Sequence, residues 1–241
     1  MRLQEQLEHE GQWLFQWRSY LPFLMVPFIP FALLSSSEPS PTYTIICLFV
    51  SFLGFFIRCF TIGYAPRGTS DKKTGGQFAE VLNTTGIYSL VRHPLYLGNF
   101  LILLGVLLFV KTFWFILLGV LIYWLYYERI ILVEESFLIK KFGQTYVLWA
   151  NHTPTFFPAF KNWKKSENPP SFKKILRFEY YSLATLITSF TVVAFLKHLF
   201  IPSHPEFHSG WIIFFLSGAI IYFLLRFLKK KTSLLDLNGE S

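Results

Sequence analysis

The sequence predicts an all-α membrane protein with about six transmembrane helices. Its 241 residues are 53% hydrophobic and only 15% charged, a composition too apolar for an ordinary soluble domain. Crossing the hydrocarbon layer takes about 20 apolar residues, and the stretches 13–34, 42–62, 179–200 and 209–228 are long enough. Residues 95–127 form a still longer apolar run, interrupted at Lys111 and Thr112, which predicts a hairpin of two spanning helices.

The positive charges indicate the orientation of these spans. All of the 22 Lys and Arg residues except Lys111 and Lys197 fall on one side of the predicted topology. Because cytoplasmic loops carry the excess of Lys and Arg, this side is predicted to be cytoplasmic, together with both termini. The turns at 35–41, 111–112 and 201–208 then lie on the opposite side.

The chain divides into four predicted parts. Residues 1–62 form an N-terminal helical pair, in which Pro22, Pro27 and Pro30 kink the first helix. Residues 63–160 form a core made of a cytoplasmic loop, the hairpin and a cytoplasmic region that follows it. A basic linker covers 161–178, and a second helical pair with a basic tail covers 179–241.

The predicted hairpin brings two polar groups of residues to the same membrane boundary, because helices joined by a tight turn are neighbours in space. Before the hairpin lie Arg92 and His93, and Tyr96 lies at its start. The helix that continues from its second arm carries Glu128, Arg129, Glu134 and Glu135. Taken singly, each group also fits a structural role: Pro94 can open a helix, and charges at helix ends often reach for phosphates or water. Together they predict a site where a cytosolic cofactor meets a lipid head group.

Two ordered blocks carry a resemblance to a known superfamily. The first is Gly86-x-Tyr88 followed by "RHPLYLG" at 92–98, and the second joins Glu134-Glu135-x-x-Leu138 to Phe142-Gly143-x-x-Tyr146. Over about residues 80–160 the chain resembles the isoprenylcysteine carboxyl methyltransferase and phospholipid methyltransferase superfamily. The resemblance implies that S-adenosylmethionine binds at the cytoplasmic side and that a lipid substrate arrives laterally between helices.

The resemblance also implies residue roles. Gly98 would let its helix approach closely, and the backbone near Leu90 and Val91 would hold the adenosine part. One glutamate would accept the cofactor's ammonium group, while its neighbour would orient Arg92 or Arg129 by a charge-assisted hydrogen bond. The sequence does not decide between the glutamates, and we assign Glu135 with Arg92 to the catalytic set. The cofactor pocket is then predicted to contain Leu90, Val91, His93, Tyr96, Gly98 and Glu134.

Methyl transfer from a sulfonium is an in-line displacement, so the enzyme helps chiefly by holding the reacting atoms close together in a dry pocket. A carboxylate or phosphate acceptor is already anionic and needs no general base, which favours Arg92 as an anion clamp. An amine acceptor would instead need His93 or a glutamate to take its proton. No metal ion is expected to take part.

The acceptor is predicted to be a membrane lipid with an anionic head group. The isoprenylcysteine enzymes usually carry a basic residue before the proline that here is Pro154, where this chain has Asn151, His152 and Thr153. This departure, the two further spans at 179–200 and 209–228, and the basic loop that contains Arg67 and Lys72 together favour one branch of the superfamily. It is the bacterial branch that methylates a phosphate of lipid A-type glycolipids at the inner membrane. The alternatives are a prenylated cysteine carboxylate and a phospholipid amine. Residues expected to contact the head group are Arg58, Arg67, Lys72 and Arg129.

Two other classes of protein fit the sequence less well. An NADPH-dependent enzyme related to sterol reductases would carry more charged residues around 142–158. A transporter usually needs polar residues near the membrane midplane, whereas the charges here gather at one boundary. Nucleic-acid binding is not expected, because the basic residues follow a membrane face.

Overall fold

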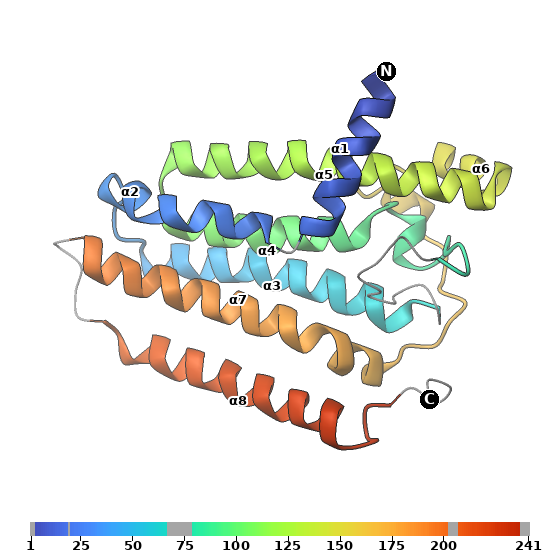
Figure 1. Ribbon diagram of the computed structural model, residues 1–241. Helices are drawn as coiled ribbons and strands as arrows, with labels where there is room; N and C mark the ends of the chain where they lie inside the picture. The colour runs from blue at the N-terminus through green and yellow to red at the C-terminus, as the bar shows by residue number, and fades with distance from the viewer. Residues whose placement is uncertain (1–2, 19, 67–78, 202–206, 237–241) are drawn as a thin grey trace.

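The computed structural model describes residues 3–18, 20–66, 79–201 and 207–236 (Figure 1). In these ranges every regular element is helical, and the one β-contact is an isolated antiparallel bridge between Gly86 and Lys164. The predicted all-α class is therefore confirmed. The elements, in chain order, are α1 (Leu3–Trp17), η1 (Leu21–Phe28), α2 (Ile29–Leu34), α3 (Pro41–Tyr64), η2 (Ile87–Ser89), α4 (Pro94–Val110), α5 (Phe113–Phe142), α6 (Gln144–His152), η3 (Phe160–Asn162), α7 (Phe172–Phe200) and α8 (Ser209–Lys231).

The long helices have the length and composition of membrane spans. Among the described residues, α3, α5, α7 and α8 are long and apolar enough to cross a membrane, and the segment Leu24–Leu34 and α4 are shorter apolar helices. Their axes are roughly parallel, and they lie side by side (Figure 1). This arrangement agrees with the predicted polytopic membrane protein.

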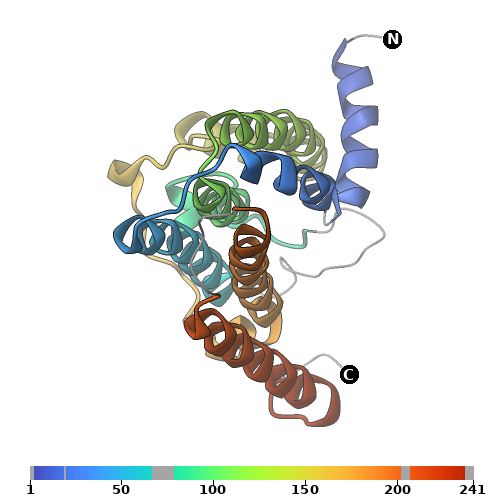
Figure 2. The ribbon, with the colours of Figure 1, turned by 90° about the vertical axis from the view of Figure 1, so that its left-hand side faces the viewer.

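The first predicted span, 13–34, is not one kinked helix, and this prediction was wrong. Helix α1 ends at Trp17, and the chain continues through the 3₁₀ helix η1 into the short helix α2. Proline has no backbone N–H, so Pro22, Pro27 and Pro30 cannot donate the hydrogen bonds that a continuous α-helix needs. Helix α1 leaves the common helix direction and crosses α5 (Figures 1 and 2).

The predicted hairpin forms, but its first arm, α4, has 17 residues and is one of the shorter apolar helices. Its turn lies at Lys111, whose left-handed backbone (φ 63°) ends α4, and at Thr112, which precedes α5. Helix α4 begins at Pro94 directly after His93, and α5 continues without interruption to Phe142. The start of α4 and the last third of α5 consequently lie at the same end of the bundle (Figure 1).

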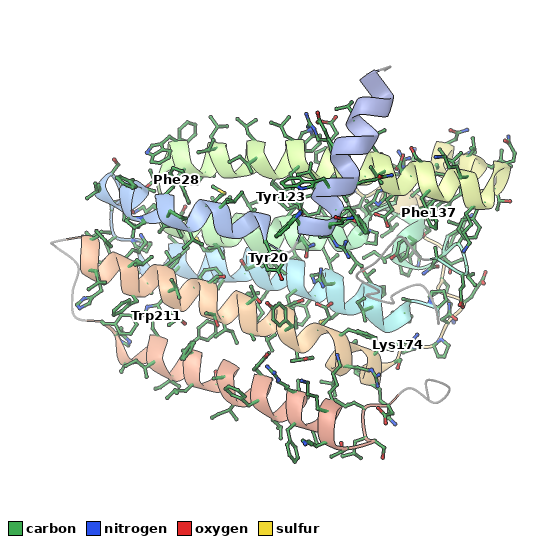
Figure 3. The ribbon with its side chains drawn as sticks, in the orientation of Figure 1. Tyr20, Phe28, Tyr123, Phe137, Lys174 and Trp211 are labelled. Atoms are coloured by element: carbon green, nitrogen blue, oxygen red, sulfur yellow. The ribbon has the colours of Figure 1, made fainter. Side chains whose placement is uncertain are left out.

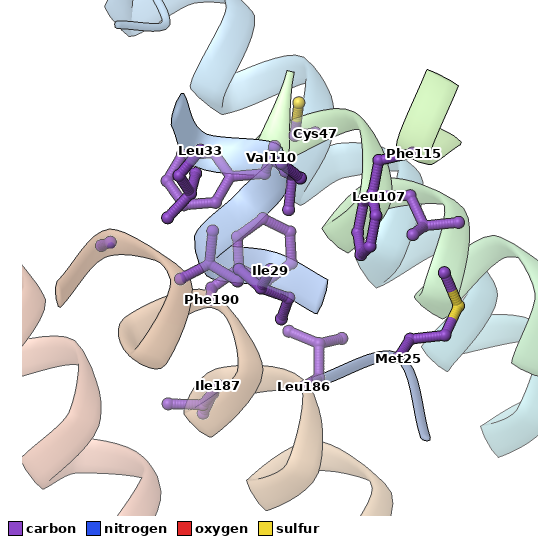
Figure 4. Close-up of a cluster of buried hydrophobic side chains, with 14 residues drawn as sticks. Met25, Ile29, Leu33, Cys47, Leu107, Val110, Phe115, Leu186, Ile187 and Phe190 are labelled. Carbon is purple, nitrogen blue, oxygen red and sulfur yellow. The ribbon is translucent and has the colours of Figure 1, made fainter. Parts of the chain in front are cut away.

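The apolar core lies at the opposite end, near the hairpin turn. Buried side chains of η1, α2, α3, α4, α5 and α7 meet there, among them Leu33, Leu107, Phe115 and Phe190 (Figure 4). Helix α8 packs chiefly on α7 and forms the edge of the bundle (Figure 2). The outward-facing side chains of α8 are largely apolar, as expected for a lipid-facing helix.

Candidate functional site

The polar residues of the two sequence blocks form one cluster between the start of α4 and the last third of α5. Arg92 Nη1 lies 2.8 Å from Glu135 Oε1, and His93 Nε2 lies 3.1 Å from the same oxygen. On the neighbouring glutamate, Glu134 Oε2 accepts a 2.8 Å hydrogen bond from the Tyr96 hydroxyl and lies 3.6 Å from His93 Nδ1. The hairpin thus brings five of the predicted site residues into direct contact.

The adjacent glutamates have different partners, because side chains of consecutive helical residues point about 100° apart. Glu135 faces Arg92 and His93, whereas Glu134 faces Tyr96 and the other ring nitrogen of His93. The His93 side chain is only 5% exposed, and its ring stacks on that of Tyr96 at 5.6 Å. The imidazole therefore bridges the two carboxylates.

A segment that the sequence analysis did not place holds the first block in position. Residues 153–164 run beside 86–92 and form backbone hydrogen bonds of 2.9 Å from Arg92 N to Pro154 O, from Ala159 N to Leu90 O and from Gly86 N to Lys164 O. Arg92 Nη2 also donates to Thr155 Oγ1. The alignment depends on Gly86, whose φ of +61° suits glycine. Backbone pairing of this kind leaves no clear pattern in the side chains, which explains why it was missed.

A cluster of tyrosines lies beside the site, toward the hairpin turn, and was also missed. Tyr123 and Tyr127 of α5 stack at 4.0 Å between ring centroids, and the Tyr96 ring lies 4.8 Å from that of Tyr127. The Tyr123 hydroxyl donates a 2.6 Å hydrogen bond to the Tyr96 carbonyl oxygen. Tyr123 lies near the crossing of α1 and α5, where Phe15 packs on the cluster (Figure 3). The available signal was the run "YWLYYE" at 123–128, which places hydroxyl groups in an otherwise apolar helix.

Helix α6 places an aromatic side chain against the contact cluster. Tyr146 is buried beside Glu135 and Arg92, and burial together with the nearby Glu135 charge raises the pKa of its hydroxyl. The Tyr146 ring contacts that of Trp149 at 5.5 Å. Trp149 Nε1 and Arg92 Nε are buried donors without a hydrogen-bond partner in the described part of the chain.

These observations fit the predicted cofactor. S-adenosylmethionine carries an ammonium group and a sulfonium for which carboxylates and aromatic faces are suitable partners, and it carries acceptor atoms for unpaired buried donors. The cluster offers Glu134, the rings of Tyr96 and Tyr127, and the unpaired donor of Trp149.

Several predicted residues lie elsewhere. Arg58 is not available to a phosphate, because its guanidinium forms a buried, two-armed ion pair with Glu179 of α7. Gly98 faces α3, where an added Cβ would lie 2.6 Å from Arg58 Cγ, so its small size serves helix packing. Arg129 pairs with Glu10 of α1 at 3.2 Å rather than with the acidic pair.

The backbone near Leu90 and Val91 is largely used within the protein. Val91 N donates to Ile87 O, and Leu90 O accepts from Ala159 N. The Val91 side chain is fully buried. These contacts shape the loop before α4 and leave its N–H groups unavailable to adenosine. The predicted head-group residues Arg67 and Lys72 lie outside the described residues.

Comparison with known proteins agrees with the residues of the site. Residues 45–145 match the family model described as phospholipid methyltransferase. The predicted superfamily resemblance is confirmed over this segment. It contains most of α3 and all of α4 and α5, and therefore the whole contact cluster of Arg92, His93, Tyr96, Glu134 and Glu135.

The curated relatives include two methyltransferases of yeasts. The chain is 36% identical over 78 residues to a protein-S-isoprenylcysteine O-methyltransferase of Schizosaccharomyces pombe, covering 32% of this chain and 33% of the relative. It is 32% identical over 113 residues to the Saccharomyces cerevisiae protein of the same name, covering 46% and 47%.

A third relative has a different name. The cobalt-zinc-cadmium resistance protein CzcN of Cupriavidus metallidurans is 36% identical over 83 residues, which cover 34% of this chain and 38% of the relative. The chain therefore spans between a third and a half of the length of these relatives. No solved structure matches it significantly.

Proposed function

We propose that this protein is an integral-membrane methyltransferase that uses S-adenosylmethionine to methylate a membrane-held substrate at the cytoplasmic face. The observation that carries the proposal is the contact cluster of Arg92, His93 and Tyr96 with Glu134 and Glu135. This cluster lies in the segment that is similar to phospholipid methyltransferases and to isoprenylcysteine O-methyltransferases. The positive charges on the same side of the predicted topology support the cytoplasmic location, and the inner membrane of a bacterium is the proposed setting.

The residues around the cluster have separate roles in this proposal. Glu134 binds the cofactor's ammonium group, and the Tyr96 hydroxyl holds that carboxylate in place through its 2.8 Å hydrogen bond. The faces of Tyr96 and Tyr127 stabilise the sulfonium by cation–π attraction. When bound, S-adenosylmethionine supplies an electrophilic methyl group. Tyr146 and Trp149 cover the site and keep water out.

The geometry favours an acceptor that is already an anion. Both ring nitrogens of His93 face carboxylate oxygens, and both glutamates are engaged by neighbouring side chains. An amine acceptor needs a group that removes its proton, whereas a carboxylate or phosphate oxygen does not. Arg92, which Glu135 and Thr155 orient, binds the anionic acceptor group by its guanidinium.

Two anionic acceptors follow from different observations. Similarity to the two isoprenylcysteine O-methyltransferases favours the carboxylate of a prenylated cysteine. The residues Asn151, His152 and Thr153 before Pro154, and the helices α7 and α8 beyond the matched segment, favour a phosphate of a lipid A-type glycolipid instead. The ion pair between Arg58 and Glu179 removes one of the cations on which the phosphate acceptor depended. We therefore place the carboxylate first.

Calorimetry tests the cofactor, and label transfer tests the acceptor. The detergent-purified protein is titrated with S-adenosylmethionine, with S-adenosylhomocysteine and, as a control, with NADPH. We expect saturable binding of the first two, lost in the Glu134→Gln/Glu135→Gln variant and retained in Glu128→Gln, an exposed position on the same helix. Binding of NADPH alone would support a reductase.

The acceptor is then identified with S-adenosylmethionine carrying a labelled methyl group. The three substrates offered are a farnesylated cysteine with a free carboxylate, a lipid A-type glycolipid phosphate and phosphatidylethanolamine. Label on either of the first two supports an anionic oxygen acceptor. Label on phosphatidylethanolamine alone would show that an amine is the acceptor and would contradict the argument from His93.

A further inference from the structure

A chain of buried and partly buried contacts connects α7 with the candidate site. Glu179 receives two hydrogen bonds from Arg58, from Nε to Oε2 at 2.8 Å and from Nη2 to Oε1 at 2.6 Å. Arg58 Nη1 donates to Asn99 Oδ1 at 2.5 Å, and Asn99 Nδ2 donates to the Tyr127 hydroxyl at 3.2 Å. The Tyr127 ring lies 4.8 Å from that of Tyr96, which holds Glu134. The contacts thus run from α7 through α3, α4 and α5 to the residue proposed to bind the cofactor.

The ion pair that begins this chain is deeply buried in helices that are candidate membrane spans. Glu179 is 1% exposed and Arg58 is 8% exposed. Ionised side chains inside spans are costly and usually mark function, and an apolar pair of similar volume is often at least as stable. Packing of α7 against α3 therefore does not by itself require this pair.

The neighbouring helices make room for the arginine. A Cβ at Gly98 would lie 2.6 Å from Arg58 Cγ and 2.8 Å from Gly54 O, so α3 and α4 can approach with the arginine between them only if this position is glycine. The glycine of the "RHPLYLG" block is thus tied to Arg58. Its neighbour Asn99 continues the polar chain.

The direction of the hydrogen bonds is fixed along the chain. Because Glu179 accepts from two arms of Arg58, the third arm is aimed at Asn99 Oδ1. The Asn99 amide nitrogen must then point toward the Tyr127 oxygen. If the carboxylate loses its charge, the guanidinium is free to turn, and the amide and the tyrosine lose their fixed orientation.

We propose that Glu179 is a positioning residue for the cofactor site, acting through Arg58, Asn99 and Tyr127 on Tyr96. This inference rests on the proposed function. The segment similar to phospholipid methyltransferases ends at residue 145, so it contains the other members of the chain but not Glu179. The C-terminal helical pair thus supplies the counter-ion for an arginine of the methyltransferase segment, which gives α7 a role beyond anchoring.

The test measures S-adenosylmethionine affinity by calorimetry for Glu179→Gln, alone and combined with Tyr96→Phe. Glu179→Gln is expected to weaken binding about fivefold to twentyfold, the range of a coupled buried network. In the Tyr96→Phe protein, which has already lost the bond to Glu134, the same change should weaken binding less than about twofold. A loss that is equal in both backgrounds, or no loss at all, would overturn the proposal.

Lys197→Met is the matched control. Lys197 is also a buried charged residue of α7, but it lies at the other end of the helix and contacts Ser36 and Ser37. The Lys197→Met variant should have a lower melting temperature and an unchanged affinity for the cofactor. A loss of affinity as large as that of Glu179→Gln would show that any damage to α7 suffices, and would refute a specific chain of contacts.

A second variant covers the case in which Glu179→Gln does not fold. Arg58→Met/Glu179→Leu removes both charges together and leaves no unpaired ion in the helix bundle. We expect it to fold and to bind S-adenosylmethionine as weakly as Glu179→Gln, and wild-type affinity would overturn the proposal. If the unchanged protein fails to bind S-adenosylmethionine, the proposed function fails; if it binds and these variants bind equally well, only the positioning role fails.

Discussion

Replacing Glu135 with glutamine should separate the orientation of Arg92 from cofactor binding. Glu135 Oε1 is shared by Arg92 Nη1 at 2.8 Å and His93 Nε2 at 3.1 Å. Glutamine keeps one acceptor oxygen but removes the charge that both contacts use. The change also brings an amide N–H group close to the guanidinium.

The magnitude follows from the two contacts and from their exposure. A hydrogen bond to a charged group contributes about 1.5–3 kcal/mol. The side chains of Glu135 and Arg92 are 22% and 18% exposed, so water screens part of this interaction. We expect a net loss of about 2 kcal/mol in the free energy of unfolding, which lowers the melting temperature of a chain of this size by about 4–8 °C. Because Arg92 is then misplaced, turnover should fall by about 100-fold.

The assay compares Glu135→Gln with Glu128→Gln, the same substitution at an exposed position of α5. Melting is followed in detergent, cofactor affinity by calorimetry and turnover by transfer of a labelled methyl group. Affinity for S-adenosylmethionine should change little, because Glu134 is the residue proposed to bind the cofactor. The reasoning is refuted if the two variants have equal turnover, or if Glu135→Gln loses cofactor affinity and keeps its turnover.

Two further predictions concern Tyr96 and Gly86. Tyr96→Phe removes the hydroxyl that donates to Glu134 but keeps the ring. Calorimetry should therefore show S-adenosylmethionine binding that is about fivefold to tenfold weaker, a loss of about 1–1.4 kcal/mol. The control variant Tyr181→Phe, at an exposed position of α7, should bind the cofactor normally. Gly86→Ala places a Cβ on a backbone with φ +61°, and this Cβ would lie 3.2 Å from Ser166 Cβ. In the control variant Gly143→Ala, φ is +55° but nothing lies within 4 Å of the added Cβ. Gly86→Ala should therefore lower the melting temperature more than Gly143→Ala. Equal melting temperatures for the two alanine variants would show that the contact with Ser166 does not matter.

The parts of the fold that the sequence predicts are those that depend on local pattern. The hairpin follows from one apolar run with a polar break, and the cluster of Arg92, His93 and Tyr96 with the two glutamates follows from the hairpin. The role of Glu135 in orienting Arg92 is one of the two alternatives that the sequence left open. Only the geometry of consecutive residues on α5 distinguishes them.

The parts that the sequence does not predict depend on contacts between distant segments or on helix ends. Hydropathy places the start of the predicted span 179–200 at residue 179, whereas α7 begins at Phe172, after Ser171, whose side chain accepts a hydrogen bond from Lys174 N. Glu179 therefore lies inside α7 rather than at its start, and from this position it pairs with Arg58. Hydropathy also cannot show that prolines divide the first span, because η1 and α2 are as apolar as a continuous helix.

The ion pair between Arg58 and Glu179 has a consequence for the order of events during synthesis. The two residues are 121 positions apart in the chain. At roughly 5–20 residues per second, Arg58 leaves the ribosome about 6 to 24 seconds before its carboxylate partner. Throughout that interval α3 contains a cation whose partner has not yet been made, and a long side chain in this situation extends toward phosphate or water. The segment similar to phospholipid methyltransferases can therefore enter the membrane early, but its polar chain is completed only when α7 arrives.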